Sequence, residues 1–176
     1  MNGARVVLSP MIEVELLGIR VETPSRTPVV ALRETAGRHR TLSIFIGAPE
    51  ATAIAFALEG VDTPRPLTHD LMRDVIDTLG VSVDRVVVTE LRDTTFFAEL
   101  HLTSMGETFV VSARPSDAVA LAARIDCPIF VNDDVLDVAG VDEVVETDEP
   151  ASEDAEEVVE EFRQFIENIN PDDFAS

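Results

Sequence analysis

The hydrophobic positions in the first quarter of the chain follow the period of β-strands. In residues 11–22, apolar side chains occupy positions 12, 14 and 16, the two-residue spacing of a strand with one buried face. Residues 28–34 and 41–47 are two more apolar runs, separated by the polar segment 35–40. Short apolar runs on either side of a polar turn predict a β-hairpin.

A helix is predicted directly after this hairpin. The segment from Ala51 to Leu58 is rich in alanine, and Pro49 and Glu50 precede it. Proline and an acidic residue favour the first turn of a helix, and Gly60 stands where a helix commonly ends.

The same succession of elements returns 66 residues later without a gap. A strand, a hairpin and a helix are predicted again, at residues 81–90, 94–100, 107–113 and 118–125. Pro49 and Pro115 fall at equivalent positions in the two series. We therefore predict an internal duplication of a β-β-β-α unit, with copies at about 11–60 and 77–126.

The segment between the copies predicts a stiff connector and a third helix. Residues 63–66, Thr-Pro-Arg-Pro, favour extended backbone. Thr68 is predicted as the N-cap of a helix that ends at Gly80. Its apolar side chains have helical spacing, at Leu71, Met72, Val75, Ile76 and Leu79.

The C-terminal part predicts a short strand, a linker and a final helix. Residues 128–131 read as a buried strand, and the acidic run around 146–154 reads as a linker. Ser152 is a predicted N-cap for a helix that Pro171 stops. Its apolar face consists of Val158, Phe162, Phe165, Ile166 and Ile169. A short acidic helix is marginal alone, so this face is expected to dock on its own domain or on a partner chain.

Together these patterns predict an α+β protein. Duplicated β-β-β-α units form a mixed or antiparallel sheet packed with helices, followed by a C-terminal amphipathic helix. The expected organisation is an N-terminal extension at 1–10, a domain at 11–140, and an acidic linker with the final helix at 141–176.

The charge of the chain argues against a strongly basic nucleic-acid surface. The net charge is −21, and residues 133–176 hold seventeen Asp and Glu against one Arg. Nine Phe but no Trp or Tyr are present, so tyrosine and tryptophan stacking platforms for single strands are absent. A nucleic-acid substrate would have to be held by a local group of arginines, weakly and with strong salt dependence.

Cysteine content and targeting signals add little chemistry. Cys127 is the single cysteine, which excludes an intrachain disulfide, and its apolar surroundings favour a buried thiol over a nucleophile. No apolar run reaches the ~18 residues of a membrane span, and the N-terminal apolar stretch is too short for a signal peptide. We expect a cytoplasmic protein. The best-marked enzyme motifs, such as the Walker A loop and the HExxH zinc helix, are absent.

Several segments resemble the bifunctional nuclease family. They are the opening IEVELLGIRVE, the helix entries IGAPEATAIA and SARPSDAVALA, the connector RPLTHDLMRDVI, the strand PIFV and the tail FRQFIENINPDDF. The resemblance implies an α+β fold, assembly into a homo-oligomer and the ability to cut both DNA and RNA. It supplies no catalytic mechanism, so candidate residues follow from chemistry.

Phosphodiester hydrolysis needs an activated water and stabilisation of charge on the phosphate. His69 is a candidate general acid or base, with Asp70 orienting it, although both residue types also suit the exposed start of a helix. Arg114, Ser116 and Asp117 surround another helix start, where free N–H groups and a guanidinium attract phosphate. Asp117 has the alternative role of a helix cap, and Arg114 that of an ion-pair partner of Asp117 or Asp70.

Three further residues complete the candidate set. Glu50 occupies the matching place in the first unit, and Glu50 and Asp117 would flank one cleft if the two helix starts come together. Arg65 and Arg73 lie near the middle segment as possible phosphate contacts, with plain solvation as the alternative. A divalent metal such as Mg²⁺ or Mn²⁺ is an open possibility, with Asp70 and Asp117 as candidate ligands.

Three functions compete at this level. The first is a nuclease of broad specificity. The second is a non-catalytic regulatory or interaction protein that docks through its acidic final helix, with Phe162 and Phe165 as contacts. The third is a domain that binds a small anion or metabolite at its helix N-termini.

Overall fold

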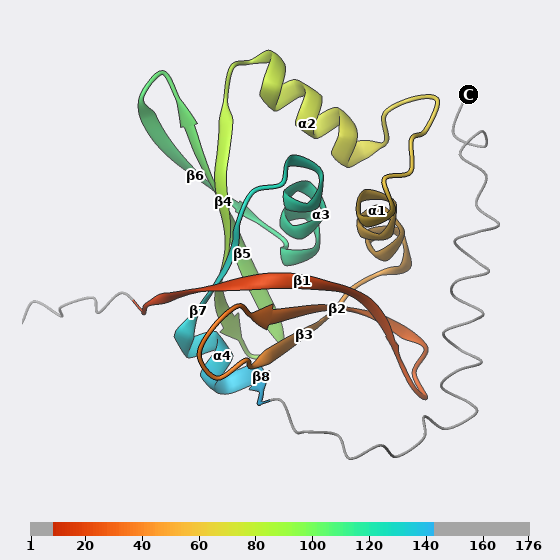
Figure 1. Cartoon of the computed structure of the whole chain (residues 1–176), viewed down its shortest axis with the longest axis vertical. Coiled ribbons are helices and arrows are strands. Elements are labelled where there is room, and N and C mark those ends of the chain that lie inside the picture. The colour runs from red at the N-terminus through yellow and green to blue at the C-terminus, as the bar shows by residue number, and fades with distance from the viewer. Residues whose placement is uncertain (1–8, 143–176) are drawn as a thin grey trace, which may run out of the picture.

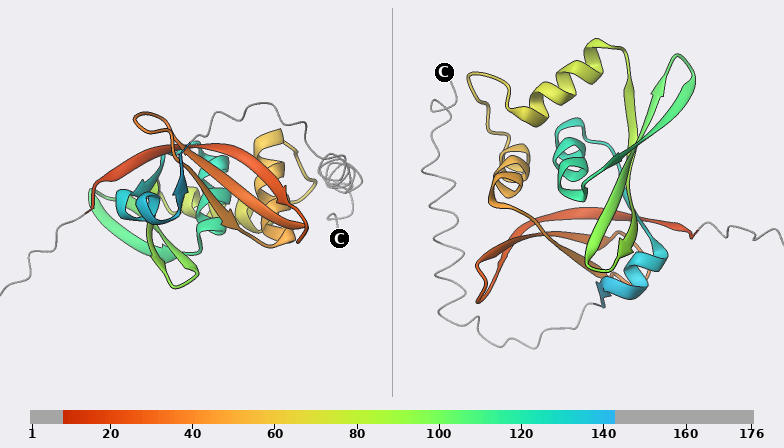
Figure 2. Two further views of the ribbon diagram at one scale, coloured as in Figure 1. Left: turned by 90° about the horizontal axis from the view of Figure 1, so that it is seen from below. Right: turned by 180° about the vertical axis from the view of Figure 1, so that it is seen from behind.

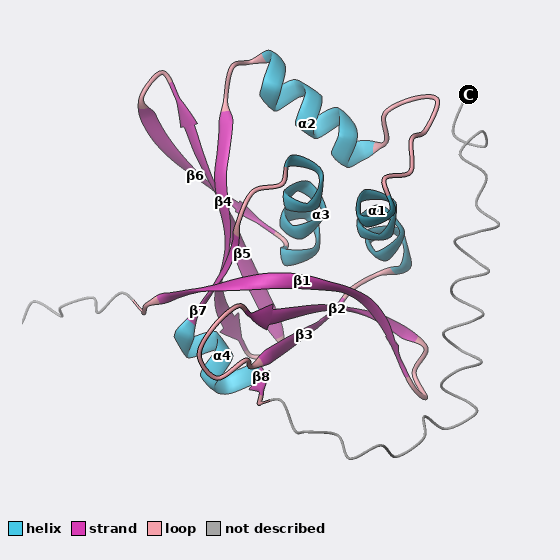
Figure 3. Cartoon of the chain, in the orientation of Figure 1, coloured by secondary structure: helices cyan, strands magenta, loops and turns pink. Residues whose placement is uncertain are grey.

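The computed structural model describes residues 9–142. Within this range eight strands form one mixed sheet, and four helices accompany it (Figures 1 and 3). In chain order the elements are β1 (Met11–Glu22), β2 (Thr27–Glu34), β3 (Thr41–Phe45), α1 (Ala48–Glu59), α2 (Thr68–Thr78), β4 (Ser82–Arg92), β5 (Thr95–Ser104), β6 (Glu107–Ala113), α3 (Pro115–Ile125), β7 (Ile129–Asn132), α4 (Asp133–Ala139) and β8 (Gly140–Val141). The predicted α+β class is confirmed.

The sheet consists of two antiparallel meanders joined through one short strand. The strand order is β6-β5-β4-β7-β1-β2-β3-β8. β7, the predicted strand PIFV, pairs parallel with β4 and antiparallel with β1, so it links the two meanders. Figure 2 shows the two halves of the sheet running in different directions, with α1 and α3 beside each other against them. This arrangement brings the beginnings of α1 and α3 together.

Each meander is followed by one of these two helices, as predicted. The helices begin differently, however: Pro49 is the second residue of α1, whereas Pro115 is the first residue of α3. The 66-residue offset that aligns the prolines therefore does not align the helix positions. An origin of the two halves by duplication stays a prediction.

The core between sheet and helices is aliphatic. Fully buried side chains come from both meanders and from α1, α3 and α4, among them Leu32, Leu42, Ile54, Val86, Leu121 and Leu136. Burial raises the pKa of Cys127 to about 11. Its thiol is therefore protonated near neutral pH, as expected of a structural cysteine.

The middle helix α2 departs from its prediction in two ways. Its N-cap is Leu67, and Thr68 is already the first helical residue. The Asp70 carboxylate accepts a hydrogen bond from the N–H of the N-cap Leu67 at 3.0 Å. The apolar face is also largely open: Leu71, Met72, Val75 and Leu79 are exposed. The reason is that α2 lies across α3 at the outside of the molecule rather than on the sheet (Figure 1).

A buried arginine fastens the β2–β3 turn to α4. The Arg40 side chain is 4% exposed and contacts three carboxylates: Glu34 at 2.6 Å, Asp133 at 2.7 Å and Asp137 at 2.6 Å. Glu34 also accepts the Arg40 backbone N–H at 2.7 Å. These hydrogen bonds lower the pKa of Glu34. We call these four residues the Arg40 cluster.

Some predictions concern residues outside the described range of 9–142. They are the extension at 1–10 for its first eight residues, the acidic linker, and the final helix with Phe162 and Phe165. Among the helices of the described range, none combines the length and apolar character of a membrane span.

Candidate functional site

Three helices of the structure carry an acidic residue at the same position of their first turn. Glu50, Asp70 and Asp117 are each the third residue of their helix, in α1, α2 and α3 respectively. A negative charge there is stabilised by the free N–H groups and the positive end of the helix dipole. The three carboxylates differ in their partners, and this difference separates two sites.

Arg114 joins the beginnings of α1 and α3. Its Nη1 forms an ion pair with Glu50 Oε1 at 3.0 Å. Its Nε and Nη2 donate to the two oxygens of Asp117, at 2.7 and 2.9 Å. The sequence left open whether Arg114 pairs with Asp117 or with Asp70, and the structure places it on Asp117 and Glu50. The beginnings of α1 and α3, which were expected to flank one cleft, are therefore bridged by a single guanidinium.

The Arg114 guanidinium remains accessible although it is doubly paired. The side chain is 65% exposed, while Glu50 and Asp117 are 19% and 29% exposed. Its hydrogen bonds lower the pKa of Asp117, which is therefore ionised at neutral pH. Asp117 in turn raises the pKa of Arg114. The result is a fixed positive group, open to solvent on one side and anchored by carboxylates on the other.

His69 contacts the same carboxylate from α2. Its Nε2 lies 3.2 Å from Asp117 Oδ1, and the residue is buried. An ionised carboxylate only accepts hydrogen bonds, so Nε2 carries the proton in this contact. The four side chains form one chain of contacts, Glu50–Arg114–Asp117–His69, which we call the Arg114 cluster.

Gly47 allows Glu50 to take its place in the cluster. Gly47 is the N-cap of α1 and has an ordinary negative φ, so backbone strain does not require glycine there. A Cβ atom on it would collide with Oε2 of Glu50. The missing side chain is what lets the carboxylate fold back over the helix start toward Arg114.

A cavity of about 420 Å³ lies beside the Arg114 cluster. It is bordered by the end of β3, the beginnings of α1 and α3, and the β4–β5 turn. Glu50, Arg114 and Ser116 all line it, and Ser116 is otherwise buried. Asp117 and His69 stand behind Arg114 and do not belong to the lining.

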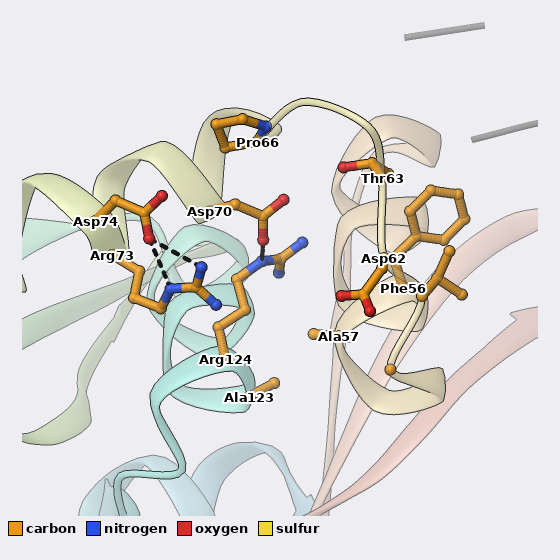
Figure 4. Close-up of a pocket in the computed structure, with 12 residues that line it drawn as sticks. Phe56, Ala57, Asp62, Thr63, Pro66, Asp70, Arg73, Asp74, Ala123 and Arg124 are labelled. Carbon is orange, nitrogen blue, oxygen red and sulfur yellow. Dashed lines mark hydrogen bonds and ion pairs between the residues drawn. The ribbon is translucent and has the colours of Figure 1, made fainter. Parts of the chain in front are cut away.

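Asp70 belongs to a second site, near the C-terminal end of α3 (Figure 4). Arg124 donates to Asp70 Oδ1 at 2.5 Å, and its side chain is 4% exposed. Burial by itself would raise the pKa of Asp70, but the hydrogen bonds from Arg124 and the Leu67 N–H outweigh it, and the pKa is lowered. A cavity of about 360 Å³ adjoins this pair, with Arg73 on its border. Arg73 itself binds Asp74 at 2.8 Å.

His69 and Asp70 were assigned to one site from the sequence, but the structure places them in two. His69 and Asp70 are neighbours in the chain but contact different partners, so Asp70 does not orient His69. Arg65 is exposed, and within residues 9–142 its side chain makes no hydrogen bond or ion pair. Arg124 was not among the candidates. Its partner Asp70 is 54 positions away, and the residues next to Arg124 in the sequence do not indicate this pairing.

The expected metal ligands do not converge. Asp70 and Asp117 are held by different arginines. In the described part of the chain, no group of three or more His, Cys, Asp or Glu side chains is arranged to hold a cation. The Arg114 guanidinium lies between Glu50 and Asp117 and pairs with both.

Comparison with known proteins identifies relatives of two kinds. The chain is 47% identical to an uncharacterized protein of Mycobacterium tuberculosis over 163 residues, 92% of this chain and 97% of the relative. It is 27% identical to bifunctional nuclease 1 of rice over 120 residues, and 30% identical to bifunctional nuclease 1 of Arabidopsis thaliana over 108 residues. These matches cover 66% and 60% of this chain but only 36% and 33% of the plant proteins.

The family match covers most of the described residues. Residues 30–144 match the bifunctional nuclease domain, a range that contains both arginine sites and the cavity beside Arg114. The resemblance noted from the helix entries and the connector is thereby confirmed. The chain belongs to the bifunctional nuclease domain family.

Proposed function

We propose that this protein is a nuclease that hydrolyses phosphodiester bonds of DNA and RNA at the Arg114 cluster. The observation that carries the proposal is the exposed guanidinium of Arg114, fixed by two carboxylates at the border of a cavity. Membership of the bifunctional nuclease domain family supports the reaction class.

In this proposal Arg114 binds the phosphate. A guanidinium offers five N–H donors and matches the oxygens of a phosphate. Asp117 holds the guanidinium by two hydrogen bonds, whereas Glu50 forms an ion pair with Nη1. An incoming phosphate therefore replaces the Glu50 contact more readily than the Asp117 contact. Glu50 is then released while Arg114 stays anchored.

The released Glu50 carboxylate is the proposed general base. DNA lacks a 2′-hydroxyl group, so a site that cuts both nucleic acids cannot depend on that hydroxyl, and the proposed nucleophile is water. Glu50 takes a proton from this water, the water oxygen attacks phosphorus, and the bond to the leaving sugar oxygen breaks. The leaving oxygen takes a proton from solvent, and Glu50 returns its own proton to solvent. Asp117 and His69 are positioning residues: Asp117 orients Arg114, and His69 holds Asp117 from behind. Ser116, on the border of the cavity, is the proposed second phosphate contact.

Binding of the polyanion is proposed to be weak and sensitive to salt, because few arginines and many carboxylates surround the site. Arg65 and Arg73 are proposed as outlying phosphate contacts on the α2 side. Replacing either by alanine should weaken binding only slightly. The slope of log affinity against log salt concentration should become shallower by about one, the loss of one phosphate contact.

The test is a nuclease assay on purified protein with single-stranded RNA and DNA. Arg114→Ala should lower the rate by about a hundredfold, as for the loss of one positioned donor to a transition-state charge. Arg38→Ala is the matched control. Arg38 is also exposed and also bridges two carboxylates, Asp142 by two hydrogen bonds and Asp137 by one. Equal loss in both variants, or activity that survives Arg114→Ala, would remove the assignment.

The participation of Mg²⁺ or Mn²⁺ is a separate proposal. The roles given to Arg114 and Glu50 do not depend on a metal ion. If activity disappears with EDTA and returns with Mg²⁺ or Mn²⁺, a cation takes part in the reaction.

We also propose that two copies of the chain associate through β6. This strand is at the edge of the sheet, and Phe109, Val110 and Val111 on it are exposed. The opposite edge strand, β8, has two residues, whereas β6 has seven and contains no lysine, arginine or proline. A long apolar edge without such protection favours pairing with another strand, and antiparallel pairing of β6 with its copy satisfies both edges at once.

Light scattering on a sizing column tests this association. Val110→Lys should shift the protein toward the monomer, while Val138→Lys, at another exposed valine on α4, should not. A wild-type protein that elutes as a monomer at micromolar concentration would contradict the proposal.

A further inference from the structure

The lining of the cavity beside Arg114 contains two chemically different groups of residues. One group is charged or polar and consists of Glu50, Arg114 and Ser116. The other consists of two phenylalanines, Phe45 at the end of β3 and Phe96 at the start of β5. The proposed reaction uses only the first group, and the two phenylalanines are left without a role.

Phe45 is not explained by packing. Its side chain is 63% exposed, compared with 47% for Phe109, the other exposed phenylalanine of residues 9–142. Its neighbours Ile44 and Ile46 point into the core and are buried. The alternation of β3 thus turns Phe45 outward, at the point where the strand reaches the cavity and α1 begins. Phe96, by contrast, packs partly against the core and supplies a fixed wall.

The β4–β5 turn adds polar groups to the lining of the cavity. Thr94 and Thr95 line the cavity and are exposed. Within residues 9–142 their hydroxyl groups make no side-chain hydrogen bond. A hydroxyl both donates and accepts, so these two groups can meet the edge of any nucleobase without selecting one.

We propose that this cavity binds one unstacked nucleobase against Phe45, while Arg114 binds the adjoining phosphate. The inference rests on the proposed nuclease function and adds that the substrate is bound as a single strand. The volume of about 420 Å³ lies within the range of about 300–1,000 Å³ found for small-ligand pockets. Aromatic faces bind bases of every kind, which suits a site of broad sequence specificity.

The geometry explains why the substrate is a single strand. The base and its phosphate are recognised at one place, because Arg114 and Phe45 line the same cavity. In a duplex the base must first leave its stack and its partner, which costs a few kcal/mol. An acidic protein with few arginines has little electrostatic attraction to offset that cost. Unpaired segments are therefore bound in preference to duplexes.

The experiment measures binding apart from cleavage. The probe is a short single-stranded DNA with phosphorothioate linkages and a fluorescent label, compared with its duplex by fluorescence anisotropy. Phe45→Ala should weaken single-strand binding about tenfold, the loss of one stacked base, with little change for the duplex. Phe45→Tyr keeps an aromatic face and should retain the affinity. Val138→Ala removes another exposed apolar side chain, on α4 and outside the lining of the cavity, and serves as the control.

The outcomes separate this inference from the proposed function. If Phe45→Ala binds the single strand as tightly as the wild type, or if no single strand is bound at all, the base pocket is overturned. A protein that cleaves nucleic acid equally well with and without Phe45 keeps its nuclease function and loses the pocket. A protein that binds the single strand through Phe45 but cleaves nothing keeps the pocket and loses the nuclease function.

Discussion

The Arg114 cluster and the Arg40 cluster use the same chemistry in opposite surroundings. In each, one guanidinium joins carboxylates from segments that are distant in the chain. Arg40 is 4% exposed and fills the space between the β2–β3 turn and α4. Arg114 is 65% exposed and borders a cavity.

This difference in exposure decides what each cluster does. A buried arginine that loses its partners leaves an uncompensated charge, so the Arg40 cluster acts on stability. An exposed arginine contributes little to stability, because water replaces its partners at small cost. The Arg114 cluster is therefore free to exchange a carboxylate for a phosphate, which a sealed cluster does not do.

The largest effect on folding is expected from Arg40→Ala. It leaves the buried Glu34 carboxylate without its main partner and should lower the free energy of unfolding by about 3 kcal/mol. The value is at the low end for a broken buried pair because Asp133 and Asp137 reach solvent. Urea denaturation followed by circular dichroism measures it. A change below about 1 kcal/mol would show that the cluster is no more than a surface pair.

The complementary change, Arg114→Ala, should separate activity from stability. The rate of nucleic-acid cleavage is expected to fall by about a hundredfold, while the free energy of unfolding changes by about 1 kcal/mol or less. The same urea titration and a nuclease assay on one protein preparation give both values. A variant that loses activity only because it unfolds would erase the contrast between the two clusters.

Gly47→Ala tests the position of one carboxylate in the open cluster. The added Cβ displaces the Glu50 carboxylate from its place over the helix start, so the cleavage rate should fall about tenfold. The backbone conformation of Gly47 suits alanine, and the fold should therefore persist. Gly37→Ala in the β2–β3 turn is no matched control, since Gly37 has a φ of +88°. Ala48→Ser, at the neighbouring position of α1, is preferable and should leave the rate unchanged.

The smallest effect is a difference in pH dependence. Hydrogen bonds from Arg114 lower the pKa of Asp117, so the carboxylate stabilises the fold above its unfolded pKa. That contribution is lost as the pH falls through the lowered pKa in the folded protein. Asp117→Asn should therefore flatten the decline of unfolding free energy in acid, below a pH of about 4. An unchanged acid profile would show that Asp117 is not coupled to folding.

The sequence predicted the elements well because their signals are local. Alternating apolar residues, prolines at helix starts and glycines after helix ends each act within a few positions. The elements from β1 to β7 appear where they were expected, whereas α4 and β8 were not predicted. The same signals did not predict burial. The helical spacing of Leu71, Val75 and Leu79 defined α2 correctly, but these side chains face solvent because α2 lies outside the layer formed by α1 and α3.

The sequence did not predict which charged residues pair with one another. Glu50, Arg114 and Asp117 were selected for their helix positions, and the topology of the sheet then brought two of those helix starts together. Arg124 and Arg40 were missed, because their partners depend on the crossing of α2 over α3 and on the docking of α4. Phe45 looked like an ordinary strand residue until its exposure beside the cavity was known.

The most direct measurement is a crystal structure with a short phosphorothioate single strand bound. We predict that a phosphate accepts hydrogen bonds from the Arg114 guanidinium, that Glu50 no longer contacts Nη1, and that the Asp117 contacts persist. A strand bound instead beside Arg73 and Arg124, with the Glu50–Arg114–Asp117 bridge intact, would contradict the assignment of the open cluster as the phosphate site.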